Sequence, residues 1–353
     1  MQETTRVFAV LGDAPLRRQV QQQWRGNGTT LCGMHAESSD SLVEEITRMR
    51  PDVVVIDVET DGARALIQAA ATRLRVPVVA LVRAQQPSFT ALRPFEWGAA
   101  TVVVREADSV QELAGHLEAA VRDVHDAQVV DVMESHFPLS GAFPDASVFD
   151  LRRNLQTHAP SAKIVAVGAG VGGPMAVRRI LTELRTAVVS PVVIAQRLPE
   201  ALMPAFVQWL EHHTGTTVVR AVSGPLEVGT VYVVPSGCEA RVESHSGAPT
   251  LAITATECAT APGFDVLFES VAATYGDRGI AVVLTGRGND GAQGLVAVRR
   301  AGGLTIAQDR VSSLVFEAAG HARDGGGAIE CLPINEIAER IQMLMRAEPA
   351  SRS

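Results

Sequence analysis

The sequence has few of the features that mark metal-binding, membrane or nucleic-acid-binding proteins. Its 353 residues include four cysteines without a CxxC pair, which argues against a metal cage or a disulfide framework. No apolar run approaches the roughly 20 residues of a membrane span, and the N-terminus lacks the apolar region of a secretion signal. The net charge of −8 argues against general nucleic-acid binding, which needs a basic face. These absences predict a cytoplasmic protein with no direct membrane insertion and no nucleic-acid partner.

Apolar residues, in contrast, are plentiful: they make up 46% of the chain, against 20% charged residues. At roughly 150 residues per domain, the length predicts two domains. Five β/α units over residues 1–126 predict a flavodoxin-like parallel sheet with helices on both faces. Prolines, serines and glycines over 127–162 predict a linker. A second β/α series over 163–346 predicts a doubly wound, mostly parallel α/β domain, and 347–353 a short tail.

Short Val-rich runs place the strands of both series. Those expected in the first series are Val7–Leu11, Thr30–Met34, Val53–Asp57, Val78–Val82 and Thr101–Val104. Those expected in the second series are Lys163–Val167, Val192–Gln196, Ile280–Leu284 and Leu304–Ala307, with several short strands between 217 and 253.

Four motifs in the second series carry a family resemblance. They are IVAVGAGVGGP at Ile164–Pro174, VVIAQRLP at Val192–Pro199, PGFDVLF at Pro262–Phe268 and LTGRGNDG at Leu284–Gly291. In order and spacing they resemble the catalytic domain of the CheB family of chemotaxis methylesterases. The resemblance implies a methylesterase-like fold, a Ser–His–Asp triad and action on the glutamate methyl esters of chemoreceptors.

The same alignment of motifs shows which reactive groups are missing. Gly170 stands at the family's serine position and Arg197 at its histidine position, while Asp290 matches the aspartate. Glycine has no nucleophilic atom, and arginine, with a pKa above about 12, cannot accept a proton at neutral pH. The sequence therefore predicts an inactive scaffold. Arg287 replaces a methionine of the family, and we expect Arg197 and Arg287 to face Asp290 or an anionic group of a partner.

Two alternatives remain open at this point. The first is an active methylesterase and glutamine deamidase with a relocated nucleophile, for which Thr285, Asn289 and Ser161 are candidates. None of them lies at the strand-to-helix turn beside an obvious histidine, and the pair His212 and His213 lies on a predicted helix.

The second alternative is nucleotide binding. Gly168, Gly170 and Gly173 satisfy the G-x-G-x-x-G pattern between a strand and a helix, where backbone amides hold a pyrophosphate. Arg197 then ends the next strand, near the position of a 2′-phosphate contact. A single Ser-to-Gly change in the family turn is sufficient to create this pattern.

The first series resembles a response-regulator receiver domain. Pro51–Asp57 has the pattern of the phospho-acceptor strand, with Asp57 at the acceptor position. Of the acidic pair that helps receivers to bind Mg²⁺ only Asp13 remains, so Asp13 and Asp57 form at best a weakened magnesium site. Val82 replaces the switch hydroxyl and Arg105 replaces the lysine. Asp57 is either a phospho-acceptor or simply an acid that ends a buried strand, and no other cofactor is expected.

The resemblance and its departures together predict a non-hydrolytic chemosensory regulator. The framework of turns and apolar strands specifies the fold without the triad. The expected partners are the cytoplasmic domains of chemoreceptors or the chemosensory kinase complex.

Overall fold

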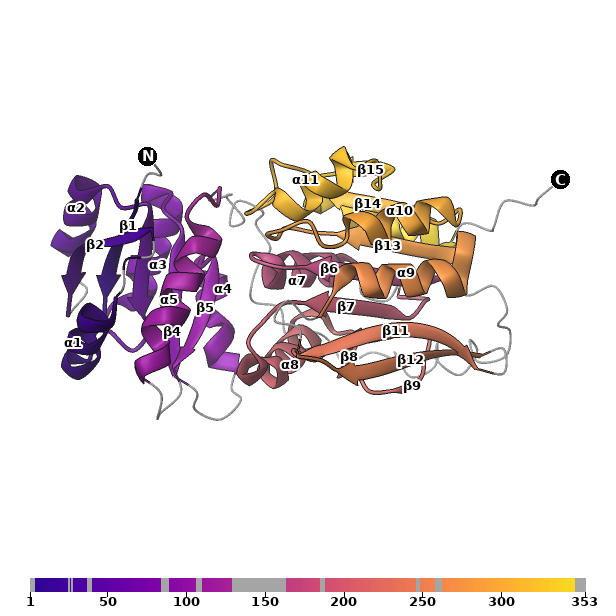
Figure 1. Cartoon of the computed structure of the whole chain (residues 1–353), viewed down its shortest axis with the longest axis horizontal. Coiled ribbons are helices and arrows are strands. Elements are labelled where there is room, and N and C mark those ends of the chain that lie inside the picture. Colours follow the sequence, from indigo (N-terminus) through magenta and orange to yellow (C-terminus); the bar gives the residue numbers. More distant parts are fainter. Residues whose placement is uncertain are drawn as a thin grey trace.

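The computed structural model of the chain has two lobes that lie side by side (Figure 1). It describes residues 4–24, 26, 28–36, 40–83, 89–105, 110–128, 163–184, 188–245, 248–257 and 262–346. We call the described residues up to 128 the receiver-like region and those from 163 onward the esterase-like region. Nearly all of the predicted linker and the whole predicted tail lie outside the described residues. Among the described helices, none has the length and apolar character to cross a membrane.

The receiver-like region is a five-stranded parallel sheet with the strand order β2-β1-β3-β4-β5. This is the flavodoxin-like order, and it confirms the predicted fold. The strands are β1 (Thr5–Val10), β2 (Thr29–His35), β3 (Val53–Asp57), β4 (Val78–Arg83) and β5 (Thr101–Arg105). The helices are α1 (Ala14–Gln23), α2 (Asp40–Met49), α3 (Ala63–Ala69) with a π-helical turn η1 (Ala70–Leu74), η2 (Phe89–Leu92), α4 (Arg93–Trp97) and α5 (Val110–Val124).

The esterase-like region is built on a seven-stranded parallel sheet with the order β15-β14-β13-β6-β7-β10-β8. Its strands are β6 (Ile164–Ala169), β7 (Val192–Gln196), β8 (Thr217–Arg220), β10 (Thr230–Val233), β13 (Gly279–Val283), β14 (Leu304–Gln308) and β15 (Glu330–Leu332). A separate antiparallel sheet contains β9 (Gly224–Pro225), β11 (Cys238–His245) and β12 (Ala248–Ala255). The helices are α7 (Gly173–Leu184), η4 (Glu200–Leu202), α8 (Met203–Thr214), α9 (Phe264–Tyr275), η5 (Gly276–Arg278), α10 (Ala292–Arg300), α11 (Glu317–Asp324) and α12 (Ile334–Arg346).

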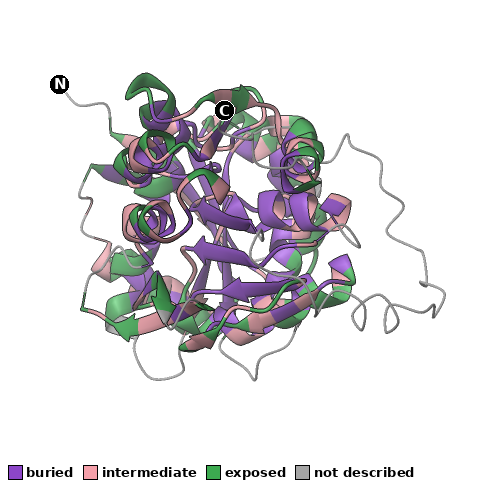
Figure 2. Ribbon diagram, turned by 90° about the vertical axis from the view of Figure 1, so that its right-hand side faces the viewer, coloured by how far each residue is buried: buried purple, intermediate pink, exposed green. Residues whose placement is uncertain are grey.

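The chain order of this sheet creates a crevice beside β6. From β6 the chain adds β7, then the edge strand β8, then β10 between them, and it returns to add β13, β14 and β15 on the other side. In open α/β sheets, ligands bind at such a reversal, outside the carboxyl ends of the strands. Figure 2 shows the central strands buried, with helices whose outer faces are exposed. The loops that follow β6, β7 and β13 therefore meet at one edge of the sheet.

The two regions pack against each other through helices. Buried apolar side chains of η2 and α4 join the same hydrophobic cluster as those of α7 and α8. Leu92 and Phe95 belong to this cluster on the receiver-like side, and Phe206 and Trp209 on the esterase-like side. The interface thus has an apolar centre, and the polar contacts described below lie around it.

Candidate active site

The carboxyl ends of three neighbouring strands bring the predicted triad positions together. Gly170 follows β6, Arg197 follows β7, and Asp290 lies in the loop after β13. The strands β7, β6 and β13 are adjacent in the sheet. The three positions therefore lie at one edge of the sheet, and we call the site formed by Gly170, Arg197 and Asp290 the cleft.

Gly170 is enclosed by backbone. Its N–H donates to the carbonyl of Thr285 at 2.9 Å, and its own carbonyl accepts from the side-chain amide of Gln196 at 3.0 Å. A Cβ atom built on Gly170 would lie 3.0 Å from the Cα of Gly286, so any side chain here requires a small backbone shift. The position offers no nucleophile and little room for one.

Arg197 occupies the position from which a base would act, and it forms an ion pair with Asp290. Its Nη2 donates to Oδ2 of Asp290, and the two side chains are 25% and 22% exposed. The guanidinium carbon also lies 4.4 Å from the centre of the Phe264 ring, which adds a cation–π contact. The cation is therefore held on two sides, by a carboxylate and by an aromatic face.

Asp290 has a second set of partners that is independent of Arg197. Its Oδ2 and Oδ1 accept the backbone N–H groups of Phe264 and Asp265, at 2.8 and 2.9 Å. These are the first amides of α9, which have no partner within the helix, so Asp290 caps this helix. Asp265 in turn accepts the N–H groups of Gly291 and Gly294, at 3.0 and 2.6 Å, at the start of α10. The two carboxylates therefore fix the starts of two helices reciprocally.

A fourth charged residue, Glu239, lies near this group and was not recognised in the sequence. Its Oε2 atom is buried and has no hydrogen-bond partner among the described residues. Burial raises the pKa of the Glu239 carboxyl, and the negative charge of Asp290 raises it further, whereas Arg241 and Arg197 act in the opposite direction. Glu239 lies on β11, which pairs with β12 in the antiparallel sheet and belongs to none of the triad motifs in the sequence. No sequence motif therefore marked this residue.

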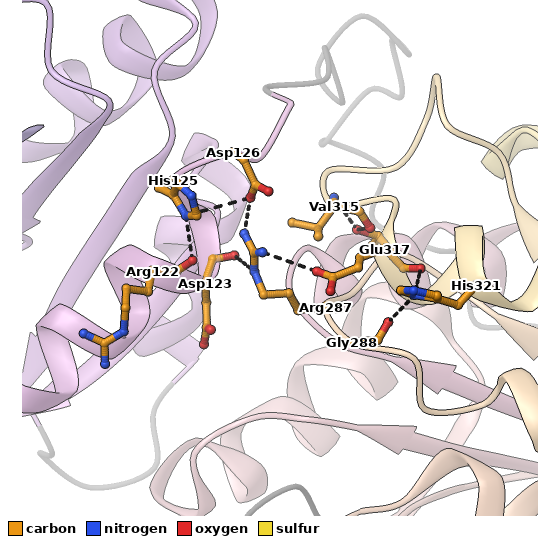
Figure 3. Close-up of polar contacts among 10 residues, drawn as sticks. Arg122, Asp123, His125, Asp126, Arg287, Gly288, Val315, Glu317 and His321 are labelled. Carbon is orange, nitrogen blue, oxygen red and sulfur yellow. Dashed lines mark hydrogen bonds and ion pairs between the residues drawn. The ribbon is translucent and has the colours of Figure 1, made fainter. Parts of the chain in front are cut away.

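Arg287 was expected to face Asp290 or an anionic group of a partner, and its side chain instead contacts acidic residues other than Asp290. The guanidinium donates to the carbonyl of Asp123 at 2.9 Å and to the carboxylates of Asp126 and Glu317 (Figure 3). Asp123 and Asp126 lie at the end of α5 and just beyond it, in the receiver-like region, whereas Glu317 begins α11. Arg287 is thus a contact between the two regions.

A second polar contact between the regions centres on Glu96 of α4. Its Oε1 atom accepts the indole N–H of Trp209 at 2.8 Å and Nη1 of Arg178 at 3.3 Å. The Nε2 atom of His213 lies 3.3 Å from the same oxygen. Arg178 also lies over the Trp209 ring, 5.1 Å from its centre. One carboxylate of the receiver-like region therefore meets three polar groups from α7 and α8.

The cleft faces the receiver-like region. A cavity of about 1040 Å³ lies between the two regions, lined on one side by Gly170 and Arg197. On the other side it is lined by residues of β5 and α5, among them His116 and Asp123. Access to the cleft is therefore shaped by the receiver-like region as well as by the esterase-like region.

The candidates for a relocated nucleophile are engaged elsewhere. The Thr285 hydroxyl donates to the carbonyl of Val171 at 2.9 Å and accepts the N–H of Val315 at 3.0 Å. Ser236, which lines the cavity, donates to the carbonyl of Leu198. Asn289 is exposed, and Ser161 lies outside the described residues. The Thr285 and Ser236 hydroxyls thus bond to backbone groups and not to an imidazole.

Packing accounts for the glycines of the G-x-G-x-x-G pattern. A Cβ on Gly168 would lie 2.7 Å from the ring of Phe264, and one on Gly173 would lie 2.2 Å from Oε1 of Gln196. Both positions require glycine because of neighbouring side chains, whether or not a nucleotide binds.

The receiver-like region has its own charged site, which we call the receiver pocket. It contains Asp13, Asp57, Arg83 and Arg105, at or just after the ends of β1, β3, β4 and β5. Nη2 of Arg105 lies 3.0 Å from Oδ2 of Asp13, and Nη2 of Arg83 lies 3.8 Å from the same atom. The Leu16 N–H lowers the pKa of Asp13, with help from Arg105, whereas burial raises the pKa of Asp57.

Comparisons with known proteins agree with the motifs. A family model described as CheB methylesterase matches residues 165–341. A protein-glutamate methylesterase/protein-glutamine glutaminase of Nitrosospira multiformis is 31% identical over 322 residues, which cover 88% of each chain. The protein-glutamate methylesterase FrzG of Myxococcus xanthus is 32% identical over 302 residues, covering 83% of this chain and 84% of that protein. The crystal structure of the Thermotoga maritima CheB methylesterase catalytic domain is 28% identical with a TM-score of 0.50, covering 52% of this chain and 99% of that domain.

Proposed function

This chain belongs to the CheB methylesterase family, and we propose that it regulates a chemosensory pathway by binding its partners and not by hydrolysing esters. The observation that carries the proposal is the composition of the cleft. Gly170 provides no attacking atom, and Arg197, paired with Asp290, provides no proton acceptor. Asp290 alone has no base to orient, because it caps α9 and pairs with a permanent cation.

The expected loss in the rate of ester hydrolysis supports inactivity. Removing one member of such a triad typically costs on the order of 10⁴ or more in rate. With two members replaced, only binding and backbone donors remain to stabilise a transition state. The proposed partners are the cytoplasmic domains of chemoreceptors or the kinase complex bound to them, and the proposed location is the cytoplasm. The related proteins named above are methylesterases, which favours the same class of partner.

The ion pair between Arg197 and Asp290 affects how Arg197 can contact a partner. Arg197 was expected to face Asp290 or an anionic group of a partner, and in the structure it pairs with Asp290. A receptor glutamate would have to compete with that pair and with the Phe264 ring. We therefore propose that Arg197 mainly neutralises the former active site and that partners are recognised by the surfaces around it.

The deciding experiment is the release of methanol from methylated receptor membranes. The parent protein is expected to release no more than a buffer control. The variant that combines Gly170→Ser with Arg197→His is expected to gain some turnover, limited by the close approach of Gly286 to position 170. Turnover by the parent protein above background would refute the proposal and favour an active methylesterase.

Binding is tested separately with a receptor cytoplasmic fragment in a pulldown. The parent protein is expected to be retained, and Arg197→Ala is expected to be retained equally well. Failure of the parent to bind either the receptor fragment or the kinase complex would contradict the proposed partner class. A thermal shift with NADP or ATP at millimolar concentration would instead support the nucleotide-binding alternative.

Phosphorylation of Asp57 stays a prediction of its position alone. The side chain ends β3 and is 4% exposed, and its Oδ1 accepts the N–H of Glu59 at 3.0 Å. Val82 next to the pocket offers no hydroxyl to a phosphoryl group, so any coupling to loop movement is expected to be weak. Incubation with acetyl phosphate followed by mass spectrometry tests whether the aspartate accepts phosphate.

A further inference from the structure

The receiver pocket does not have the ligands that a divalent cation needs. Mg²⁺ prefers about six oxygen ligands at roughly 2.1 Å, usually including one or two carboxylates. Asp13 is the only acid directly after β1, and both of its oxygens are engaged. Its Oδ1 accepts the N–H of Leu16 at 3.2 Å and caps α1, while its Oδ2 accepts from Arg105 at 3.0 Å. Over the described part of the chain, no group of three or more His, Cys, Asp or Glu side chains is arranged to hold a metal ion.

A guanidinium group lies beside the carboxylate that a metal would need. Arg105 ends β5, next to β4, and its side chain is 17% exposed. Arg83 ends β4 in the paired position, contacts the edge of Asp13 at 3.8 Å and is anchored by Glu59 at 2.8 Å. Burial raises the pKa of Asp57, and the two arginines act in the opposite direction, as nearby positive charges do. The positive charges beside Asp13 are therefore supplied by arginine side chains of the protein itself.

Among the four charged side chains of the receiver pocket, the buried atom without a partner has the wrong sign for a metal site, although the nearby Thr60 hydroxyl oxygen is also buried without a partner among the described residues. The Nη1 atom of Arg105 is buried and has no hydrogen-bond partner among the described residues. An empty cation site should leave oxygen lone pairs without partners, because these are the atoms that coordinate the ion. Here the unpartnered atom is a charged donor, which repels a cation and attracts an anion.

The two arginines are the counter-charges of the pocket. Both lie beside Asp13 and both act electrostatically on Asp57, while Arg83 also pairs with Glu59, so two guanidinium groups face three carboxylates. Buried carboxylates require counter-charges, and guanidinium groups supply them without the cost of dehydrating a small divalent ion. We infer that Arg105 and Arg83 replace the divalent cation in the receiver pocket, which is therefore independent of metal. The receiver-like region then keeps one charge state whatever the magnesium concentration.

Thermal unfolding of the full-length protein with and without MgCl₂ tests this inference, with KCl added to keep the ionic strength constant. The wild type is expected to show no saturable shift in Tm. The double variant Arg83→Ala with Arg105→Ala is expected to unfold at a lower temperature and to be restored by Mg²⁺ by roughly 5 °C, because Asp13 and Asp57 are then free to bind it. The matched control is Arg18→Ala with Arg64→Ala, which removes two exposed arginines of the same region.

A saturable rise in the Tm of the wild type with Mg²⁺ would overturn the inference. So would a folded double variant that responds to Mg²⁺ no more than the control does. If the double variant does not fold, a measurement on the wild type still tests the inference. Mn²⁺ added to the labelled protein is expected to leave the amide NMR signals around Asp13 and Asp57 as sharp as those elsewhere in the protein, and their selective broadening would also overturn the inference.

Discussion

The cleft of the esterase-like region and the pocket of the receiver-like region differ from their families in the same way. In each, an aspartate stays at its position and an arginine pairs with it: Arg197 with Asp290, and Arg105 with Asp13. They differ in what else the aspartate does. Asp290 accepts two backbone amides of α9 at short distance, whereas Asp13 accepts a single amide of α1 at 3.2 Å. The comparison teaches that Asp290 supports more of the surrounding backbone than Asp13 does.

The largest expected effect comes from removing the two aspartates in turn. Asp290→Ala leaves Arg197 without its ion-pair partner and the start of α9 without acceptors, and we expect a loss of about 3 kcal/mol in the free energy of unfolding. Asp13→Ala removes one helix cap and two partly exposed ion pairs, with Arg105 and Arg83, and we expect about 1 kcal/mol. Urea unfolding of the full-length protein measures both. The control Asp290→Asn keeps an amide acceptor and should lose less than the alanine variant, whereas equal losses at positions 290 and 13 would break the comparison.

A smaller effect is expected at the contact that joins the two regions. Glu96→Ala leaves the Trp209 N–H and Arg178 without their acceptor, and we expect a cost of about 2 kcal/mol. Hydrogen exchange should increase in α4 and α8, because the two helices are held together at this point. The matched control is Glu44→Ala, on the exposed face of α2. Unchanged exchange in α8 would mean that the apolar contacts alone hold the regions together.

The third prediction concerns the unpartnered acid of the cleft and depends on pH. The pKa of Glu239 is raised in the folded protein, so its ionised form is disfavoured there relative to the unfolded chain. Glu239→Gln is therefore expected to stabilise the protein by about 1 kcal/mol at pH 7. The gain should shrink as the pH falls through the raised pKa and vanish below the unfolded value of about 4.3.

Urea midpoints measured across that pH range check this prediction. Glu211→Gln, at an exposed position of α8, is the control and should show no such trend. A gain that persists at the acidic end of the range would show that the charge of Glu239 is not the cause.

The smallest effect is expected at Arg287. Its partners Asp126 and Glu317 are 58% and 40% exposed, so the ion pairs are screened by solvent. Arg287→Met restores the residue typical of the family, and we expect a loss of only about 0.5 kcal/mol. Small-angle scattering should show a wider distribution of distances between the two lobes. A loss as large as that at Glu96 would identify Arg287 as the main contact between the regions.

Most of the fold followed from the sequence because its strands are short Val-rich runs in parallel sheets. β3 and β7 begin and end where the apolar runs predicted, and the order of the first sheet is the expected one. The short helix α11 and the edge strand β15 were not predicted. Each is too short to show a periodicity, and β15 pairs along only one edge.

The cleft was predictable to the extent that its residues lie in contiguous motifs. Gly170, Arg197 and Asp290 follow recognisable strands, so their proximity could be deduced from the family order. The direction of Arg287 and the role of Glu96 depend on contacts between residues more than 80 positions apart, across two separately folded sheets. No local pattern encodes such pairs, and sequence reasoning therefore missed one of them and misplaced the other.

Asp290 and Asp265 each accept backbone amides at the start of a helix beside the other residue. This mutual capping affects how inactive relatives can be identified. Because each of these acids accepts amides at the start of the other's helix, both have a structural role that does not depend on catalysis. Their presence is thus a poor sign of activity. Gly170 and Arg197, which follow β6 and β7, do not cap a helix in this way. The residue types at these two turns therefore distinguish an active hydrolase from an inactive relative.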